Sequence, residues 1–283
     1  MAMSASTRSG LPTRRPDFLY LNHPPQEPVM QFFKSAVVTA VALCAALAVQ
    51  ARTLDEIKKD GKIIVATEGQ FAPFNYFEGT KLTGFEVEVA ELVVKKMGLK
   101  LEWKTLGFDA LLTGLGQNRW DAVIASHGVT EERAKAVTFA NPHYCSGGMI
   151  VAMDAKIRTA ADLTGKVVAV QTGTSYLTNV QKLAGVKEVK NFPQDTDAQR
   201  ALISKRVDAW VSDKFVAKEA AAKNAKAGFK LGDMLFIERI APAMAKGNTG
   251  LADAWNKAFT EVLADGSYAA VSKKYFNEDV RCN

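Results

Sequence analysis

The chain has 283 residues, of which 48% are hydrophobic and 23% charged, the composition of an ordinary globular protein. Its length suffices for one large domain or two of medium size. The net charge of +6 is spread along the chain with no long block of basic residues, so it indicates a solvated surface and argues against a nucleic-acid partner.

The start of the chain resembles a leader segment. Residues 1–29 hold five of the nine prolines and show no apolar periodicity, which indicates an unfolded or misassigned extension. From Met30 a short start with Lys34 precedes an uncharged apolar run over 35–49, shorter than the roughly 20 residues that span a bilayer. This pattern predicts a secretory signal peptide over 30–51 and translation from Met30. The alternative is an N-terminal membrane anchor.

Secretion implies an oxidising compartment. Cys145 and Cys282 remain after cleavage at residue 51, and they either pair in a disulfide or stay as two thiols. No CxxC motif or Cys/His cluster occurs, so neither a metal nor another cofactor is expected.

Strand-like and helix-like segments alternate along the mature chain. In the first half we expect strand 62–67, helix 84–97, strand 101–104, helix 108–116, strand 120–125, helix 131–136 and strand 148–153. In the second half we expect strand 166–170, helix 174–183, strand 186–191, helix 197–204, strand 207–212, helix 214–225, strand 236–245 and helices 251–264 and 268–276. Two such sets predict an α/β fold with mainly parallel sheets and a ligand cleft between two similar halves.

Several ordered motifs resemble those of the polar-amino-acid family of periplasmic binding proteins, the soluble receptors of ABC importers. The resemblance covers about 53–277 and rests on ATEGQFAPFNY (66–76), LTGFEVEVAELVVKKMG (82–98), FDALLTGLGQNRWDAVIA (108–125), VTEERAKAVTFANPHY (129–144), DLTGKVVAVQTGTS (162–175), RVDAWVSD (206–213) and DGSYAAVSKKYF (265–276).

This resemblance implies a two-lobed type II periplasmic-binding-protein fold, in which each lobe is a mainly parallel sheet flanked by helices and two strands form the hinge. Lobe 1 would comprise 52–142 and 242–283, and lobe 2 would comprise 148–237. The hinge crossings would lie at 143–147 and 238–241.

The resemblance also implies a function. The protein would bind a free amino acid in the periplasm by closing its lobes, and deliver it to an ABC transporter permease in the inner membrane. It would act as a monomer, because both lobes must face the transporter, and it would need no cofactor and catalyse no reaction.

A free amino acid carries a carboxylate and an ammonium, and each needs a partner once closure removes water. Arg133 lies in VTEER, where the family has its carboxylate-binding arginine, and its fork can form two parallel hydrogen bonds. Thr174 and Ser175 begin a helix whose backbone N–H groups attract the same carboxylate. Asp213 matches the family's ammonium-binding aspartate, with a helix cap as the alternative.

Other positions bear on the side chain of the ligand and on its ammonium. Phe71 and Phe108 match the aromatic residues that enclose the ligand side chain, although a phenylalanine is also a common core residue. Backbone carbonyls near Ala125 and Ser126 would accept the remaining ammonium protons.

Selectivity among amino acids depends on positions at which this chain departs from the usual family residue. Glu68, where the family often has aspartate, favours a polar or basic ligand, and Gln171 would contact the ligand side chain from lobe 2. Gly128 departs from the family, which usually has Ser or Thr there, and this loss of a hydroxyl would enlarge the pocket. The neighbouring His127 either faces the ligand, adding pH sensitivity, or points into lobe 1.

Two other functions remain open from the sequence. The scaffold also resembles periplasmic dehydratases that act on prephenate-like acids, and Glu68, His127 and Asp213 are the candidates for an acid or base. A sensor would need a membrane span and a signalling domain beyond Asn283. The Arg133–Asp213 combination suits an α-amino acid without any chemistry, which favours the binding receptor.

Overall fold

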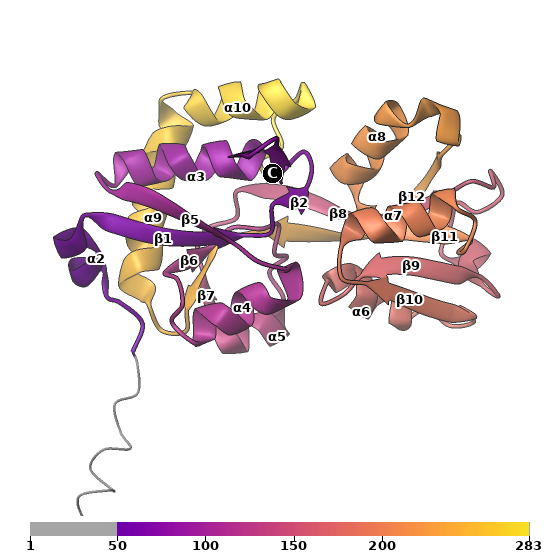
Figure 1. The fold of residues 1–283 in the computed structure, drawn as a ribbon, viewed down its shortest axis with the longest axis horizontal. Coiled ribbons are helices and arrows are strands. Elements are labelled where there is room, and N and C mark those ends of the chain that lie inside the picture. The colour runs from indigo at the N-terminus through magenta and orange to yellow at the C-terminus, as the bar shows by residue number, and fades with distance from the viewer. Residues whose placement is uncertain (1–49, 283) are drawn as a thin grey trace, which may run out of the picture. The chain divides into compact units, whose positions relative to one another are not determined.

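Two five-stranded sheets carry the fold of residues 50–282, the part of the chain that this computed structural model describes. We call the first sheet and its helices lobe 1, and the second sheet and its helices lobe 2 (Figure 1). In each sheet, three neighbouring parallel strands are followed by one antiparallel strand and then by a fifth strand parallel to the first three. The expected mainly parallel sheets are therefore confirmed.

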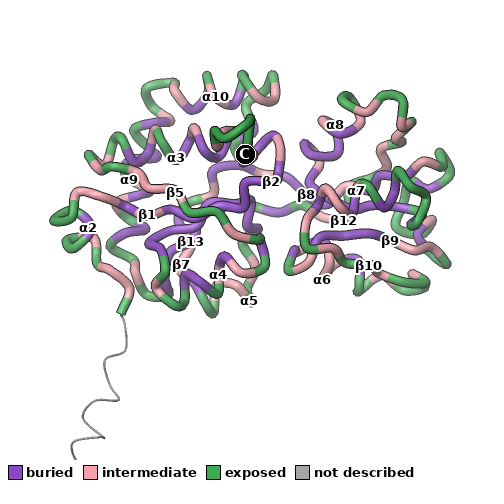
Figure 2. Tube along the Cα trace, viewed as in Figure 1, coloured by how far each residue is buried: buried purple, intermediate pink, exposed green. Residues whose placement is uncertain are grey.

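The strands of lobe 1 have the order β5-β1-β6-β13-β7 and those of lobe 2 the order β10-β9-β11-β8-β12. The lobe 1 strands are β1 (Lys62–Thr67), β5 (Lys100–Thr105), β6 (Ala122–Val123), β7 (Val137–Phe139) and β13 (Ala243–Ala245). The lobe 2 strands are β8 (Tyr144–Ala152), β9 (Val167–Gln171), β10 (Glu188–Phe192), β11 (Ala209–Asp213) and β12 (Lys230–Ile240). The central strands β9 and β11 are buried almost throughout (Figure 2), as expected for parallel strands covered on both faces.

Helices cover the sheets. The lobe 1 helices are α2 (Leu54–Asp60), α3 (Phe85–Lys96), α4 (Phe108–Gly116), α5 (Glu131–Ala136), α9 (Thr249–Ala264) and α10 (Ser267–Phe276). In Figure 1, α3 and α10 lie on one side of the lobe 1 sheet, and α4 and α5 lie on the other. The lobe 2 helices are α6 (Ser175–Gln181), α7 (Asp195–Ile203) and α8 (Lys214–Lys223), with short 3₁₀ turns at Ala161–Leu163 and Ala225–Ala227.

Three side-chain caps set where the helices near the lobe junction begin. The hydroxyl of Thr130 accepts the backbone N–H of Arg133, and that of Thr174 accepts the N–H of Leu177. The carboxylate of Asp213 caps α8. Because a cap satisfies a backbone donor that the helix leaves free, each fixes the position of the first turn and of the side chains on it.

Two antiparallel strands connect the lobes. β8 begins at Tyr144, earlier than expected, and Tyr144 pairs with Ile240 at the end of β12. The single strand expected over 236–245 is wrong, because the chain leaves lobe 2 after β12 and enters lobe 1 as β13. Pro242 separates the two, and a proline has no N–H with which to continue a sheet ladder.

Other short elements were not predicted. A three-stranded sheet is formed by β2 (Gln70–Phe71), β3 (Asn75–Glu78) and β4 (Lys81–Thr83), and α2 and β7 were also missed. Strands of so few residues give too short a run for an alternating pattern to be recognised. The strand expected over 120–125 shortens to β6, after which Ser126 turns the chain with a positive φ of 57°.

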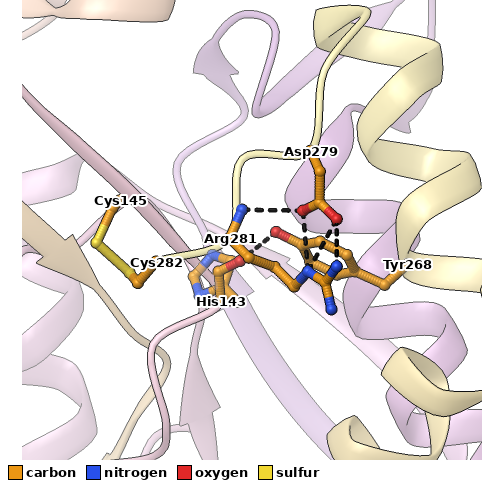
Figure 3. Close-up of a disulfide and its surroundings, with 6 residues drawn as sticks. All are labelled: His143, Cys145, Tyr268, Asp279, Arg281 and Cys282. Atoms are coloured by element: carbon orange, nitrogen blue, oxygen red, sulfur yellow. Dashed lines mark hydrogen bonds and ion pairs between the residues drawn. A yellow bond between two sulfur atoms is a disulfide. The ribbon is translucent and has the colours of Figure 1, made fainter.

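The disulfide that the sequence left open is formed between Cys145 and Cys282, whose Cα atoms lie 4.8 Å apart (Figure 3). It joins the end of the chain to β8 beside the lobe connection. The N–H of Cys145 also donates to the carbonyl of Val280 at 3.1 Å, and the hydroxyl of Tyr268 donates to the carbonyl of His143. The C-terminal segment is therefore held against β8 both covalently and by hydrogen bonds.

The extension over 1–29 and the signal peptide over 30–51, apart from its last two residues, lie outside the described part of the chain. Within residues 50–282, none of the helices combines the length and the apolar character needed to cross a bilayer.

Candidate functional site

A small cavity of about 10 Å³ lies where side chains of the two lobes meet. Lobe 1 and lobe 2 contribute four residues each, namely Glu68, Phe71, Phe108 and Ser126, and Gln171, Thr174, Ser175 and Tyr176. The sequence singled out all of these except Tyr176. The structure therefore brings together in one cavity residues that lie more than a hundred positions apart in the chain.

Aromatic rings form one wall of the cavity. The Phe108 ring stacks on His127 with a centroid distance of 4.2 Å, and the Arg133 guanidinium lies 5.7 Å from the same ring centroid. Phe71 stacks on Phe74 at 5.8 Å. Both Phe71 and Phe108 are almost completely buried, yet they line the cavity, so they combine the core role and the site role that the sequence left as alternatives.

Arg133 lies beside the cavity and bonds to both lobes. Its Nη1 donates to the carbonyl of Gly128 at 2.8 Å, and its Nη2 donates to the carbonyl of Gly173 at 3.0 Å. Burial lowers the pKa of the guanidinium, which nonetheless stays charged because its ordinary pKa is so high. A fixed positive charge with further N–H donors therefore lies at the lobe junction.

A second contact between the lobes is made by two predicted residues. Gln171 Nε2 donates to Glu68 Oε1 at 2.6 Å. Burial raises the pKa of Glu68 to about 8, although the hydrogen bond from Gln171 opposes this rise. A buried carboxyl group of this kind gains most from a ligand that brings a hydrogen-bond donor or a cation.

The hydroxyls at the start of α6 are already engaged. Thr174 Oγ1 donates to the carbonyl of Gln171 at 2.7 Å and caps the helix, while Ser175 Oγ donates to Glu238 Oε2 at 2.6 Å. Both side chains still line the cavity.

Asp213 is fully buried and does not line the cavity. Its Oδ1 accepts the backbone N–H of Phe215 at 2.7 Å, so the cap that was the alternative reading is present. Burial raises the pKa of Asp213 to about 7, while hydrogen bonds from Ser146, Phe215 and Val216 oppose this rise. The carboxylate is thus held within lobe 2 and contributes nothing to the cavity lining.

The turn after β6 is held by residues that the sequence analysis missed. Ala125 is buried, and the N–H and hydroxyl of Ser126 donate to Glu86 at 2.8 and 3.0 Å. The same carboxylate accepts from Asn75 Nδ2 at 2.8 Å and lies 2.8 Å from His143 Nε2. Glu86 therefore fixes the positive-φ turn from which the carbonyls of Ala125 and Ser126 project.

The structure corrects the expectation for Gly128 and decides between the two orientations expected of His127. Gly128 does not enlarge the pocket, because a Cβ at this position would lie 2.1 Å from Glu238 Oε2, so the glutamate fills the space. His127 is buried against Phe108, and burial, with a smaller effect of Arg133, keeps its pKa well below the ordinary value. Its ring stacks within lobe 1, the second of the two orientations that the sequence left open.

No group of three or more His, Cys, Asp or Glu side chains within the described residues is arranged to hold a metal ion. What the site offers is one guanidinium, several buried carboxyl groups, two aromatic rings and hydroxyls, a set suited to a small zwitterionic molecule.

Comparisons with known proteins show what the chain is similar to. Residues 63–278 match the family described as bacterial extracellular solute-binding proteins, family 3. The chain is 32% identical over 252 residues to the L-cystine-binding protein TcyJ of Escherichia coli K12, with 86% of this chain and 94% of TcyJ covered. An ancestral arginine-binding protein bound to arginine is similar in structure, with a TM-score of 0.74, 37% identity, and coverage of 76% of this chain and 98% of that one. An ancestral amino acid-binding protein described as a precursor of cyclohexadienyl dehydratase gives a TM-score of 0.73 and 28% identity, with 79% and 99% covered.

Proposed function

Because the chain belongs to family 3 of the bacterial extracellular solute-binding proteins, we propose that it binds a free amino acid between its lobes and delivers it to an ABC importer. The observation that carries this proposal is the position of Arg133, a charged guanidinium bonded to both lobes beside a cavity lined from both sides. The ligand carboxylate would bind to this guanidinium, and the ligand would thereby favour the closed arrangement of the lobes.

The ligand is polar or basic. Glu68, with its pKa near 8, faces the cavity and is stabilised by any ligand side chain that donates a hydrogen bond or carries a positive charge. Phe71 and Phe108 cover the apolar part of that side chain. The relatives named for arginine and cystine bind molecules of this kind.

We also propose how the protein is arranged in the cell. A signal peptide over 30–51 directs the mature chain to the periplasm, where it acts as a monomer and presents both lobes to a permease in the inner membrane. Lobe 1 comprises 52–142 and 242–283, lobe 2 comprises 148–237, and the lobes move about 143–147 and 238–241. The pairing of Tyr144 with Ile240 at the point where both strands leave lobe 2 supports this hinge.

A dehydratase is the second candidate. Glu68 supports it, since a buried carboxyl group with a pKa near 8 resembles a general acid, and one structural neighbour is described as a precursor of cyclohexadienyl dehydratase. His127, uncharged and packed against Phe108, adds no second acid or base. We therefore place binding without chemistry first.

A thermal-shift screen tests the proposal, using the twenty common amino acids, ornithine, citrulline, cystine and prephenate. A ligand that binds only the folded state adds about 2.7 kcal/mol of stability at a hundredfold excess over its Kd. We expect a rise in the melting temperature with one group of polar or basic amino acids. A shift with prephenate alone, accompanied by turnover, would establish the dehydratase instead.

A further inference from the structure

Phenylalanine rings connect the wall of the cavity to lobe 2. Phe71, which lines the cavity, stacks on Phe74 with a centroid distance of 5.8 Å. The ring of Phe276 lies 5.4 Å from that of Phe74 and 4.6 Å from that of Phe215 in α8. These are the separations of favourable aromatic pairs. Phe276 therefore contacts both the ring behind the cavity wall and a ring of the other lobe.

Phe215 and Phe276 belong to different lobes. Phe215 lies in the first turn of α8, where the carboxylate of Asp213 accepts its N–H at 2.7 Å, and it is only 5% exposed. Phe276 is the last residue of α10 in lobe 1 and is partly buried. The two rings meet at a groove of about 490 Å³ that residues of both lobes line. Their contact is thus made between the lobes, outside the cavity of the candidate site.

The chain after Phe276 is fastened to the lobe connection. The carbonyl of Val280 accepts the N–H of Cys145 at 3.1 Å, and Cys282 is bonded to Cys145 near the start of β8 (Figure 3). Only the short segment 277–282 separates Phe276 from this disulfide. The covalent link therefore limits how far the end of α10 can move away from β8.

A contact between the lobes acts differently from a contact within one lobe. A contact within a lobe stabilises the fold in every arrangement of the two lobes. A contact between them favours the arrangement in which it forms, and a ligand bound between the lobes needs that arrangement. The contact of Phe276 with Phe215 should therefore contribute to ligand affinity as well as to stability.

We propose that Phe276 is a positioning residue for the ligand site, and that the C-terminal disulfide holds it in place. Through Phe74 it supports Phe71 in the cavity wall, and through Phe215 it holds lobe 2 against lobe 1. Ligand affinity then depends on a residue of the C-terminal helix that does not line the cavity. This inference rests on the proposed function.

The main test is Phe276→Leu, which removes the ring and keeps an apolar side chain. Kd values are measured by calorimetry with L-arginine, L-glutamine and L-cystine, and the ligand used is the one that the wild type binds most tightly. We expect binding about 3- to 10-fold weaker, the factor that the loss of one aromatic pair gives. Phe215→Leu should give a similar factor, and the double variant should be little weaker than either single one, because all three lack the same contact.

Phe229→Leu is the matched control, because Phe229 is also partly buried but packs on Trp210 within lobe 2. It should lower the free energy of unfolding and change the Kd by less than about twofold. If Phe276→Leu likewise loses stability without a change in Kd, Phe276 is a packing residue and the inference is wrong. If Phe276→Leu does not fold, Phe215→Leu decides by the same criterion.

The role of the disulfide is tested by replacing Cys145 and Cys282 together with serine. This variant should bind the same ligand about two- to fivefold more weakly, and it should add little to the effect of Phe276→Leu when the changes are combined. Unchanged binding, or an equal loss with and without the Phe276 ring, would show that the disulfide does not act through Phe276.

X-ray scattering of the ligand-free proteins separates this inference from the proposed function. The radius of gyration should be larger for Phe276→Leu than for the wild type, whether or not an amino acid binds. A wild type that binds none of the three ligands counts against the proposed function. In that case a larger radius in Phe276→Leu still supports the contact between the lobes, and an equal radius refutes it.

Discussion

The carboxylates buried beside the Ser126 turn and beside the lobe connection differ in how many hydrogen bonds they accept. In lobe 1, Glu86 accepts hydrogen bonds from Asn75 and Ser126 and lies against His143, so both of its oxygens are engaged. In lobe 2, Asp213 and Glu238 are buried to a similar degree but are held by fewer hydrogen bonds, from the N–H of Phe215 and from the hydroxyl of Ser175 respectively. Burial alone therefore does not determine how many hydrogen bonds a carboxylate accepts.

The site also contains residues of two kinds, those that hold the backbone in place and those that bond across the two lobes. Glu86 holds the turn at Ser126 in its positive-φ conformation, but it does not line the cavity. Arg133, by contrast, makes its bonds across the lobes. Lobe 1 thus supplies the guanidinium from α5, whose first turn is fixed by the Thr130 cap.

The largest effect is expected from removing the engaged carboxylate. Glu86→Ala leaves the N–H of Ser126 and the amide of Asn75 without their buried acceptor, and should lower the free energy of unfolding by about 3–5 kcal/mol. Glu238→Ala removes one hydrogen bond and a poorly paired carboxyl group, so its cost should stay within about 1 kcal/mol. Urea unfolding of the ligand-free proteins measures both, and equal losses would remove the distinction between the two carboxylates.

Arg133→Ala should weaken amino-acid binding by about a hundredfold or more, because it leaves the ligand carboxylate buried without its partner. Calorimetry with the best ligand of the thermal-shift screen measures the change. Arg119→Ala, which removes an arginine that lies over the Trp120 ring and away from the cavity, should bind normally. Unchanged affinity in Arg133→Ala would remove this residue from the site.

Gly128→Ser should destabilise the protein by about 1–3 kcal/mol, because its Cβ would overlap Glu238. In the double variant with Glu238→Ala, the space is free and most of this cost should disappear. The serine should therefore cost less free energy of unfolding in the Glu238→Ala background than in the wild type, and a double-mutant cycle measures this difference. Additive losses would mean that Glu238 is not what excludes a side chain at this position.

The smallest effect concerns pH. Burial raises the pKa of Asp195 to about 7, although its oxygens accept from Trp210 Nε1 and Ser212 Oγ at 2.9 and 3.0 Å. Because the folded pKa lies above the ordinary value of 3.8, this group stabilises the fold fully below about pH 4. That contribution is lost as the pH rises toward 7, by at most about 1.4 kcal/mol per pH unit.

Asp195→Asn should flatten this slope. The comparison is made by urea unfolding at several pH values between 4 and 8, on the ligand-free protein. An unaltered slope would show that Asp195 titrates at its ordinary pKa in the folded state.

The sequence predicted those parts of the fold that depend on local patterns. The bounds of β1, α4 and α5 agree with those expected, because each is a regular apolar run or a capped helix. The division at Pro242 was missed, since the residues on both sides of it are apolar and read as one strand. Short strands such as β2 and β7 carry too little pattern to be recognised.

The site was predictable to a similar extent. Motifs pointed to most residues that line the cavity, because those residues lie at strand ends and helix starts. Glu238 could not be found in this way, since its position depends on the register between β8 and β12. Gly128 was the one signal in the sequence, as a missing side chain implies that another group takes its place.

The most direct test of the central claim is a crystal structure of the protein with the amino acid that gives the largest thermal shift. The account predicts one ligand molecule between the lobes, in contact with cavity-lining residues of both, with its carboxylate bonded to Arg133. A ligand bound outside this position, or with its carboxylate turned away from Arg133, would contradict it.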